Sequence, residues 1–479
     1  MTAFAIGDVL LLGAGRGLQM IGGIVTLRVA TGLMPPETLG YVAQTTSIVF
    51  LLCSMMVAPV NTYIGRGLLG WVDAGVARSN LLRFIKFVVI TAIACGLLVY
   101  LARSYAAIVE GLPALSIGIL TTLYVLGNSL YLSSVSALNL LGHRVAYVGF
   151  CNLSLWVGLA LAIGFYVSFP GPEAWLLGLF SGYIAASSAY LIVLKLTVKT
   201  SRRSGAYLPL TAQAVFAFAW PQVLISILWW TQTQSYRFVL GEVGGPAVVG
   251  LFVAGYTVCS GTMQSFETLF NEIYSPMMYR ALKDQSQDGL ARTWNEYASA
   301  YLPAIALFGA FLVGMGPMLA KILLADQYHE IIPFLFLPAL TEMLRAFASS
   351  LSIMGVAKLD MRINMLPVLV GAILTPVLVY CFGSIDPLLG TAVGMFFAYL
   401  IVILVVIPIS RRALPIRWPL SRILGAALLG LPMIVLGQFL QTMTDTSLVT
   451  SLCVLSIGTL YMLGAQYVMA RPWLALTKK

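Results

Sequence analysis

The sequence predicts an all-α membrane protein with about fourteen transmembrane helices, and three observations lead to this fold class. First, 60% of the 479 residues are hydrophobic, only 9% are charged and the mean hydropathy is +0.94, so most of the surface must face an apolar medium. Second, most apolar runs exceed the roughly 20 residues that a helix needs to cross about 30 Å of hydrocarbon, and they lack the alternation of barrel strands. Third, the basic residues gather in every second loop.

The expected spans follow one another with short polar breaks. They lie at residues 5–30, 39–60, 84–102, 113–141, 146–169, 175–196, 213–240, 247–271, 298–323, 331–354, 363–383, 389–409, 422–441 and 447–469. Pro35 and Pro36 separate the first two spans, and a Gly-Gly-Pro break at 244–246 separates the seventh and eighth. Longer basic segments are expected as cytoplasmic loops at 61–83, 197–212 and 272–297.

Charge placement predicts the topology independently. Most of the 27 basic residues fall in loops after even-numbered spans or in the C-terminal tail, whereas the opposite loops are acidic. The basic set includes Arg66, Arg78, Arg83, Arg144, Arg292, Arg411 and Arg412, and the acidic set includes Glu37, Glu173, Glu242, Asp326 and Asp386. By the positive-inside rule, both termini are expected in the cytoplasm. The net charge of +10 is thus attributed to topology and to contact with anionic membrane lipids, and no nucleic-acid partner is expected.

The two halves of the chain carry a repeated pattern. Arg28 and Arg237 stand at matching places near the end of the first and seventh spans, and each is followed four residues later by a glycine, Gly32 or Gly241. Such a repeat indicates a duplicated transporter fold with its site at the interface between the repeats. We expect residues 1–212 to form an N-lobe of six spans, residues 213–410 a C-lobe of six, and residues 411–479 an appended pair of spans with a cytoplasmic tail.

Arginines inside spans are the main functional signal. Arg16, Arg28 and Arg237 have no acid close in the sequence. An arginine at mid-bilayer costs about 2.5–3.5 kcal/mol even on the lenient insertion scale, so these three are expected to line a wet, cationic cavity. The alternative for Arg28 and Arg237 is snorkelling to lipid phosphate. Arg345 shares a helix face with Glu342, so it either forms a stabilising pair or belongs to the substrate cavity.

The seventh span carries a polar strip, WTQTQSYR, at residues 230–237. Gln232, Gln234 and Tyr236 are expected to face the cavity, because such side chains hydrogen-bond to sugars and stack on them. Gln19, one helical turn from Arg16, extends this polar surface. The alternative is an aromatic belt with interhelical polar contacts.

The first span also contains a GxxxG motif, formed by Gly13 and Gly17, and with Gly15, Gly22 and Gly23 it is unusually smooth and bendable. These glycines indicate close packing against a neighbouring helix. Bending of the span during gating is the alternative interpretation.

Asp8, Glu267 and Glu342 are the acids nearest to span interiors and are the candidates for coupling to a Na⁺ or H⁺ gradient. The chain has no Walker A motif, GxxxxGK[ST], so we expect no ATPase activity of its own. All six cysteines fall inside spans, where they behave as small apolar residues, so no metal site and no bound cofactor are expected.

Three segments carry a resemblance to a known family. They are TGLMPPETLGYVA from residue 31, WTQTQSYRFVLGEVGGPAVVGLFVAGYTV from residue 230 and FNEIYSPMMYRAL from residue 270. The chain resembles the polysaccharide transporter, or Wzx-type O-antigen flippase, branch of the multidrug/oligosaccharidyl-lipid/polysaccharide (MOP) exporter superfamily over nearly its whole length. Fourteen spans is also similar to the related lipid II flippases.

The resemblance implies two pseudo-symmetric lobes, alternating access and a cationic central cavity. The cargo would be a polyprenyl-pyrophosphate-linked oligosaccharide, such as an O-antigen, capsule or exopolysaccharide unit, moved from the inner to the outer leaflet. Arg16, Arg28 and Arg237 are the matching candidates for binding its pyrophosphate. Such a protein would be a multi-pass protein of the cytoplasmic (inner) membrane and would work beside glycan polymerase machinery.

Two other functions remain as alternatives. A cation-coupled multidrug exporter on the same fold would favour acidic cavity residues, whereas this chain offers arginines. A membrane-embedded glycan polymerase or glycosyltransferase would be expected to present a large external loop or an acidic motif, and neither is visible. The sequence therefore favours a transporter over an enzyme.

Overall fold

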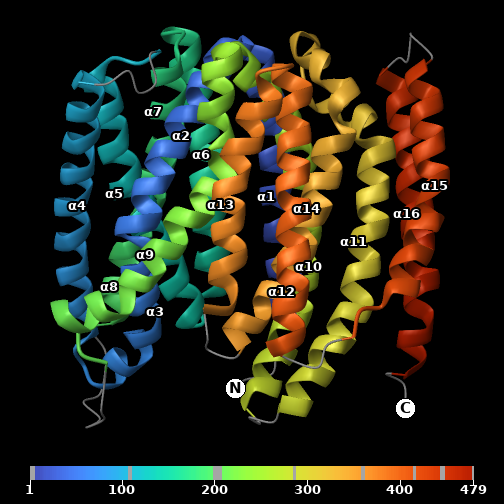
Figure 1. Ribbon diagram of the computed structural model, residues 1–479. Coiled ribbons are helices and arrows are strands. Elements are labelled where there is room, and N and C mark those ends of the chain that lie inside the picture. Colours follow the sequence, from blue (N-terminus) through green and yellow to red (C-terminus); the bar gives the residue numbers. More distant parts are fainter. Residues whose placement is uncertain are drawn as a thin grey trace. The chain divides into compact units, whose positions relative to one another are not determined.

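A computed structural model of the protein describes residues 6–105, 111–197, 208–283, 287–357, 362–413, 417–442 and 448–476. Within the helices, the side chains at 6–10, 269, 271–283, 287–288, 290, 352–357, 362–364, 413, 441–442, 448 and 470–476 lie outside this description. The regular structure of the described residues consists of helices, which confirms the all-α class (Figure 1).

The helices follow the predicted spans closely. They are α1 (Ile6–Leu33), α2 (Pro36–Met56), α3 (Ala58–Asp73), α4 (Ala77–Tyr105), α5 (Ala114–Leu140), α6 (Arg144–Ser168), α7 (Pro172–Ser187), α8 (Ala189–Leu196), α9 (Ala212–Gln234), α10 (Tyr236–Lys283), α11 (Gln287–Leu323), the 3₁₀ helix η1 (Asp326–Phe334), α12 (Phe336–Ala357), α13 (Arg362–Gly383), α14 (Pro387–Ala413), α15 (Leu420–Thr442) and α16 (Leu448–Leu476).

Within the described residues, eleven helical stretches are long and apolar enough to cross a membrane, or twelve with the bent pair η1 and α12. One stretch, Ala212–Thr268, has 57 residues and would reach about 85 Å as a straight helix, far more than one crossing requires. It is interrupted at Gly245, whose φ of 80° suits glycine, so it supplies two crossings. Helix α1, with 28 residues, is long enough for a further one. Each predicted span thus coincides with a helix or a helix pair.

Two segments expected as loops are largely helical. Helix α3 lies within the first of them, because Tyr63, Leu68 and Trp71 form an apolar face that is buried. Tyr63 Oη donates to Pro209 O and Trp71 Nε1 to Leu208 O, both over 2.6 Å, so α3 holds the start of the segment that leads into α9. In the third expected loop, α10 continues to Lys283 and α11 begins at Gln287.

The chain forms two compact units. Unit 1 comprises residues 1–30 and 38–227, and unit 2 comprises residues 31–37 and 228–479. Helices α4, α5, α6 and α7 pack together in unit 1. In unit 2, α11 lies at the centre, with α10, α12, α15 and α16 around it, and nearly all of its apolar stretch is buried. The division into two six-span lobes and an appended pair stays a prediction.

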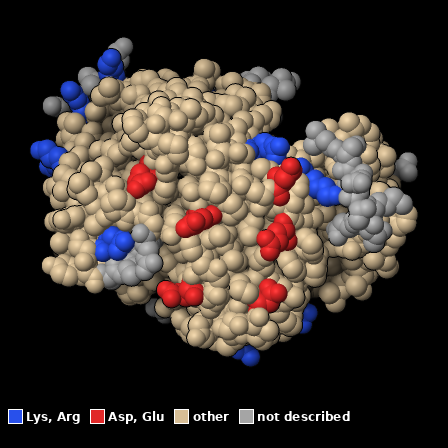
Figure 2. All heavy atoms as spheres, turned by 90° about the horizontal axis from the view of Figure 1, so that it is seen from above, with Lys and Arg blue, Asp and Glu red and all other residues tan. Residues whose placement is uncertain are grey.

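Charged side chains are unevenly distributed over the surface. In the view from above in Figure 2, acidic side chains lie across the face and basic side chains lie mostly toward its edges. The location of this face outside the cytoplasm, and of both termini inside it, stays a prediction.

The predicted close packing of the glycine-rich first span is confirmed at two of its glycines. A Cβ at Gly15 would lie 2.5 Å from Val148 Cγ1, and one at Gly22 would collide with Leu155, so α1 lies closely against α6 along the Gly15–Gly22 face. A Cβ at Gly13 or Gly17, the two residues of the GxxxG motif, would meet nothing within 4 Å. The position of α6 thus decides which glycines are covered.

We expect Gly178→Val to destabilise unit 1, because a Cβ at Gly178 in α7 would collide with backbone atoms of Ala162 in α6. Overpacking of this kind costs about 1–3 kcal/mol or more. Gly164→Val is the matched control, since a Cβ there meets nothing within 4 Å. Thermal unfolding of the detergent-purified variants, followed by size-exclusion fluorescence, should show a clear loss only for Gly178→Val; equal melting temperatures would contradict this packing.

Candidate functional site

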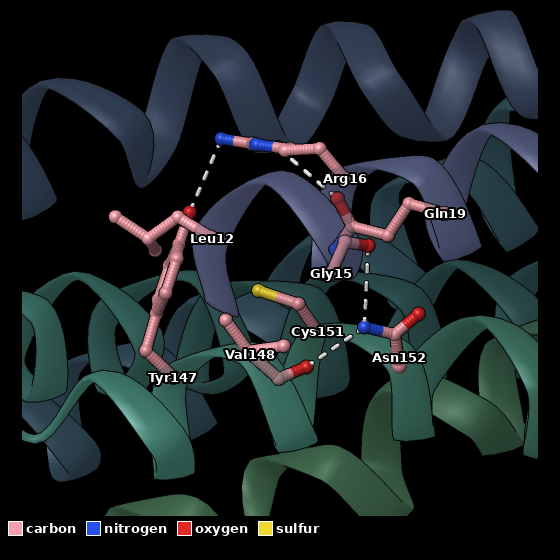
Figure 3. A pocket seen from close by; sticks show the side chains of 8 residues that line it. All are labelled: Leu12, Gly15, Arg16, Gln19, Tyr147, Val148, Cys151 and Asn152. Atoms are coloured by element: carbon pink, nitrogen blue, oxygen red, sulfur yellow. Dashed lines mark hydrogen bonds between the residues drawn. The ribbon is translucent and has the colours of Figure 1, made fainter. Parts of the chain in front are cut away.

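Arg16 lies near the middle of α1, and its guanidinium is oriented by two side chains of unit 1. Nη1 donates to Gln19 Oε1 over 3.1 Å, and Nη2 donates to Tyr147 Oη over 3.2 Å (Figure 3). Gln19 belongs to the next turn of α1, whereas Tyr147 comes from α6. The predicted association of Arg16 with Gln19 is therefore present in the structure.

The partner from α6 is itself held in place. The ring of Tyr147 packs against a buried cluster that includes Tyr131, Val135 and Cys151. Two residues, Val148 and Asn152, join α6 to α1: Val148 fills the space beside Gly15, and Asn152 Nδ2 donates to Gly15 O over 3.5 Å and to Val148 O over 3.0 Å. The packing of Tyr147 on this cluster, and the contacts of α6 with α1, thus hold the Tyr147 ring beside Arg16.

These residues surround a small hollow. Its cavity volume is about 10 Å³, room for about one water molecule, and it is partly open. The lining residues are Leu12, Gly15, Arg16, Gln19, Tyr147, Val148, Cys151 and Asn152. The Arg16 side chain is exposed. Guanidinium binds phosphate and carboxylate oxygens in a fork, so anion binding is the chemistry for which this exposed group is suited.

Arg237 begins α10 in unit 2 and is half-buried. Its Nε donates to Tyr236 Oη over 3.2 Å, and its Cζ lies 5.7 Å from the Tyr236 ring centroid, within cation–π range. Tyr236 is fully buried between Phe252 and Tyr256. Tyr236 therefore orients Arg237 from inside the unit.

The other predicted residues lie apart from these contacts. Arg28 is exposed on α1, about 18 Å along the helix axis from Arg16. Gln232 is buried against Gly371 of α13, while Gln234, the last residue of α9, is half-buried. The side chain of Asp8 lies outside the described residues.

The structure brings together three predicted residues in an ionic cluster of unit 2. Arg345 Nε donates to Glu342 Oε2 over 2.7 Å, and Arg345 Nη2 donates to Glu267 Oε2. The second oxygen of each carboxylate accepts a phenol: Tyr301 Oη donates to Glu267 Oε1 over 2.8 Å, and Tyr256 Oη donates to Glu342 Oε1. Glu342 is 1% and Glu267 6% exposed, so the cluster is buried.

This cluster contains two carboxylates and one guanidinium. If both acids are ionised, the three side chains carry a net charge of −1 in an apolar surrounding, which is unfavourable. Uptake of one proton would neutralise them. Arg345 has its two sides engaged by acids, so it is suited to balancing their charge and poorly placed to hold a substrate phosphate.

Sequence reasoning missed the tyrosines. Tyr147, Tyr256 and Tyr301 each bond to a charged side chain from another helix. The sequence separations are large, so no local spacing could indicate these contacts. Glu342 and Arg345, three residues apart on one helix, were the only part of the cluster with a local signal.

Comparison with known proteins supports the fold. No family model matches the chain, and no curated protein matches it. The solved structure of the lipid II flippase MurJ in an inward closed conformation is similar, with a TM-score of 0.71 and 13% identity over 98% of this chain and 100% of that one.

An inward-facing multidrug resistance MATE family transporter of the MOP superfamily has a TM-score of 0.57 and 13% identity, over 85% of this chain and 97% of that one. A MOP superfamily transporter from Pyrococcus furiosus, described as having a binding pocket of reverse polarity, has a TM-score of 0.53 and 14% identity, over 84% of this chain and 94% of that one. This chain thus has the fold of MOP-superfamily transporters and is a multi-pass membrane protein. Membership of the superfamily, and of a branch within it, stays a prediction.

The ionic cluster predicts a specific pattern of stability. Arg345→Met should destabilise the protein by about 3–5 kcal/mol, because two acids are left buried without their cation. The triple change Glu267→Gln, Glu342→Gln and Arg345→Met should recover most of this loss in a thermal unfolding assay. Arg292→Met, which removes an exposed pair with Glu296, should have little effect. A triple variant no more stable than Arg345→Met would show that the charge imbalance is not the cause.

Proposed function

We propose that this protein is a flippase that moves a polyprenyl-pyrophosphate-linked oligosaccharide from the inner to the outer leaflet of the cytoplasmic membrane. One observation carries the proposal: the exposed guanidinium of Arg16 lies beside a small hollow near the middle of a membrane-length helix, where Gln19 and Tyr147 orient it. A charge at such a depth is costly, so it is expected to serve an anionic ligand or a wet pathway. The fold, shared with a solved lipid II flippase, is consistent with this cargo class.

The pyrophosphate is the part of such a cargo that an arginine recognises. Guanidinium stays charged at any physiological pH and makes paired hydrogen bonds to phosphate oxygens. The attraction between guanidinium and phosphate is stronger than in bulk water wherever the surroundings lower the effective dielectric constant. The polyprenyl tail would stay in the bilayer, and the movement of the head group by alternating access would break no covalent bond.

The structure refines the roles that we propose for the individual residues. Arg16 and Arg237 are each oriented by a tyrosine, so both are proposed as pyrophosphate ligands at successive stages of transport. Arg28, being exposed, is proposed to attract the same charge. Gln19 and Gln234 are proposed to contact sugar, whereas the buried Gln232 and Tyr236 would support Arg237.

The energy source is proposed to be a proton gradient that acts through Glu267, Glu342 and Arg345. The supporting observation is that two acids share one cation in a buried site, so one added proton neutralises the cluster. The titratable groups around the pair are Tyr256 and Cys259 of α10, Tyr297 and Tyr301 of α11, Tyr399 of α14 and Tyr236. Glycan polymerase machinery is a proposed partner, because it would consume the product on the far side.

The flippase proposal is tested by moving a polyprenyl-pyrophosphate oligosaccharide across proteoliposome membranes. Arg16→Ala should lower the rate at least about tenfold, the effect of losing a charge-assisted hydrogen bond of about 1.5 kcal/mol or more. Tyr147→Phe should give a smaller loss, because it removes only the group that orients Arg16. Arg292→Ala, on an exposed helix surface, is the matched control and should transport normally.

Two results would contradict the flippase. A well-folded wild-type protein that neither binds nor moves the lipid, yet exports a small cationic dye, would assign it to the drug exporters of the same fold. An Arg16→Ala variant that is well folded and transports at the wild-type rate would remove the proposed anion site.

The coupling proposal predicts that an imposed proton gradient changes the flipping rate of the wild type. The triple variant Glu267→Gln, Glu342→Gln and Arg345→Met leaves no unpaired charge in the cluster, so it should retain the fold; it should lose this dependence, because none of the three side chains can take up a proton. A response to an imposed Na⁺ gradient and not to pH would assign the coupling to sodium instead. A triple variant that responds to pH as the wild type does would exclude the cluster from coupling.

A further inference from the structure

The end of α1 groups with a different unit from the rest of the helix. Residues 1–30 belong to unit 1 and so does the chain from residue 38 onward, but residues 31–37 between them group with unit 2. Helix α1 continues to Leu33, so its last turn lies within unit 2. The segment is thus covalently bound to unit 1 on both sides while its contacts are those of the other unit.

Specific hydrogen bonds hold this segment. Gln327 Nε2 donates to Thr31 O over 2.9 Å and to Met34 O over 3.0 Å, and Tyr328 Oη donates to Met34 O over 2.9 Å. The Ala325 backbone N–H donates to Thr31 Oγ1 over 3.3 Å. Thr31, Met34 and Tyr328 are all fully buried.

These bonds solve a problem that every helix end presents. The last carbonyl groups of a helix lack partners within the helix, and leaving them unsatisfied away from water is unfavourable. Here, the side chains of Gln327 and Tyr328, at the start of η1, supply the missing donors. Water can replace such donors if the segment becomes exposed, so the contact is of a kind that can be broken and remade.

Helix α1 has no hinge at the boundary between the two units that could bend in place of breaking these hydrogen bonds. It is a regular helix across Ala30 and Thr31, and neither residue is a proline or has a positive φ. If unit 1 moves relative to unit 2, either the hydrogen bonds part or a regular helix must bend.

We propose that Thr31 and Met34 form a latch with Ala325, Gln327 and Tyr328, and that this latch opens during each transport cycle. Its closed form is the one in the present structure. Opening releases the last turn of α1 from η1, and closing restores the donors to its carbonyl groups. The latch requires only that the protein is a transporter, so it goes beyond the identity of the cargo.

The hydrogen bonds are tested by hydrogen–deuterium exchange of peptides covering residues 28–40, with the full chain in lipid nanodiscs. Tyr328→Phe should speed exchange there by about fivefold, the factor that corresponds to one lost hydrogen bond of about 1 kcal/mol. Tyr190→Phe is the matched control: Tyr190 is also a buried tyrosine that donates to a backbone carbonyl, Leu81 O, but it lies in unit 1. Wild-type exchange in Tyr328→Phe would overturn the latch.

Opening is tested with a reversible cross-link. Thr31→Cys and Ala325→Cys should form a disulfide under mild oxidation, because the Thr31 hydroxyl already lies 3.3 Å from the Ala325 nitrogen. The cross-linked protein should lose transport of the polyprenyl-pyrophosphate oligosaccharide, and a reductant should restore it. Oxidant-treated wild type and each single variant control for the native cysteines.

Full transport by the cross-linked protein would show that the segment is a permanent anchor and would overturn the proposal. If the wild type does not move this lipid at all, the proposed function fails, but exchange still decides on the latch. The disulfide should slow exchange of residues 28–40 at least about fivefold relative to the reduced form. Equal exchange in the two forms would mean that no opening occurs.

Discussion

The free-energy cost of a charge in an apolar surrounding is the constraint on which the rest of this structure depends. With 9% charged residues in 479, the chain can form membrane-length helices only if each charge inside them is balanced or reaches water. Glu267, Glu342 and Arg345 meet this demand by mutual pairing with two phenols. Arg16 meets it differently, because its guanidinium remains exposed at a hollow. The first arrangement balances charge by pairing within unit 2, and the second leaves a guanidinium exposed.

The same constraint applies to the backbone. Hydrocarbon offers no partners to peptide groups, so helices satisfy them internally and only the helix ends remain. The ends are where this chain uses side chains as donors. Tyr63 and Trp71 hold the segment before α9, and Gln327 and Tyr328 hold the end of α1. The contacts at the end of α1 are the latch that we propose to open during transport.

The fold was largely predictable from the sequence, because crossing a bilayer demands a long apolar run and such runs are visible without a structure. Helix α3 escaped prediction, since its buried face is short and lies in a segment of mixed composition. The close packing of the glycine-rich α1 was predictable, but which glycines contact α6 was not, because the position of the neighbouring helix decides that Gly15 and Gly22 are covered. The three charged residues of the ionic cluster were each predicted as candidates, but only the pairing of Glu342 with Arg345 had a local signal; Glu267 and Tyr301 join it through tertiary packing.

The most direct test of the account is to compare how tightly the wild-type protein in nanodiscs binds two lipids that differ only in charge. One is a polyprenyl-pyrophosphate oligosaccharide, and the other carries the same glycan on the polyprenol without phosphates. If guanidinium groups recognise the pyrophosphate, the charged lipid should bind at least about tenfold more tightly, and added salt should weaken its binding. Equal affinity for the two lipids would contradict an arginine-based site for this cargo.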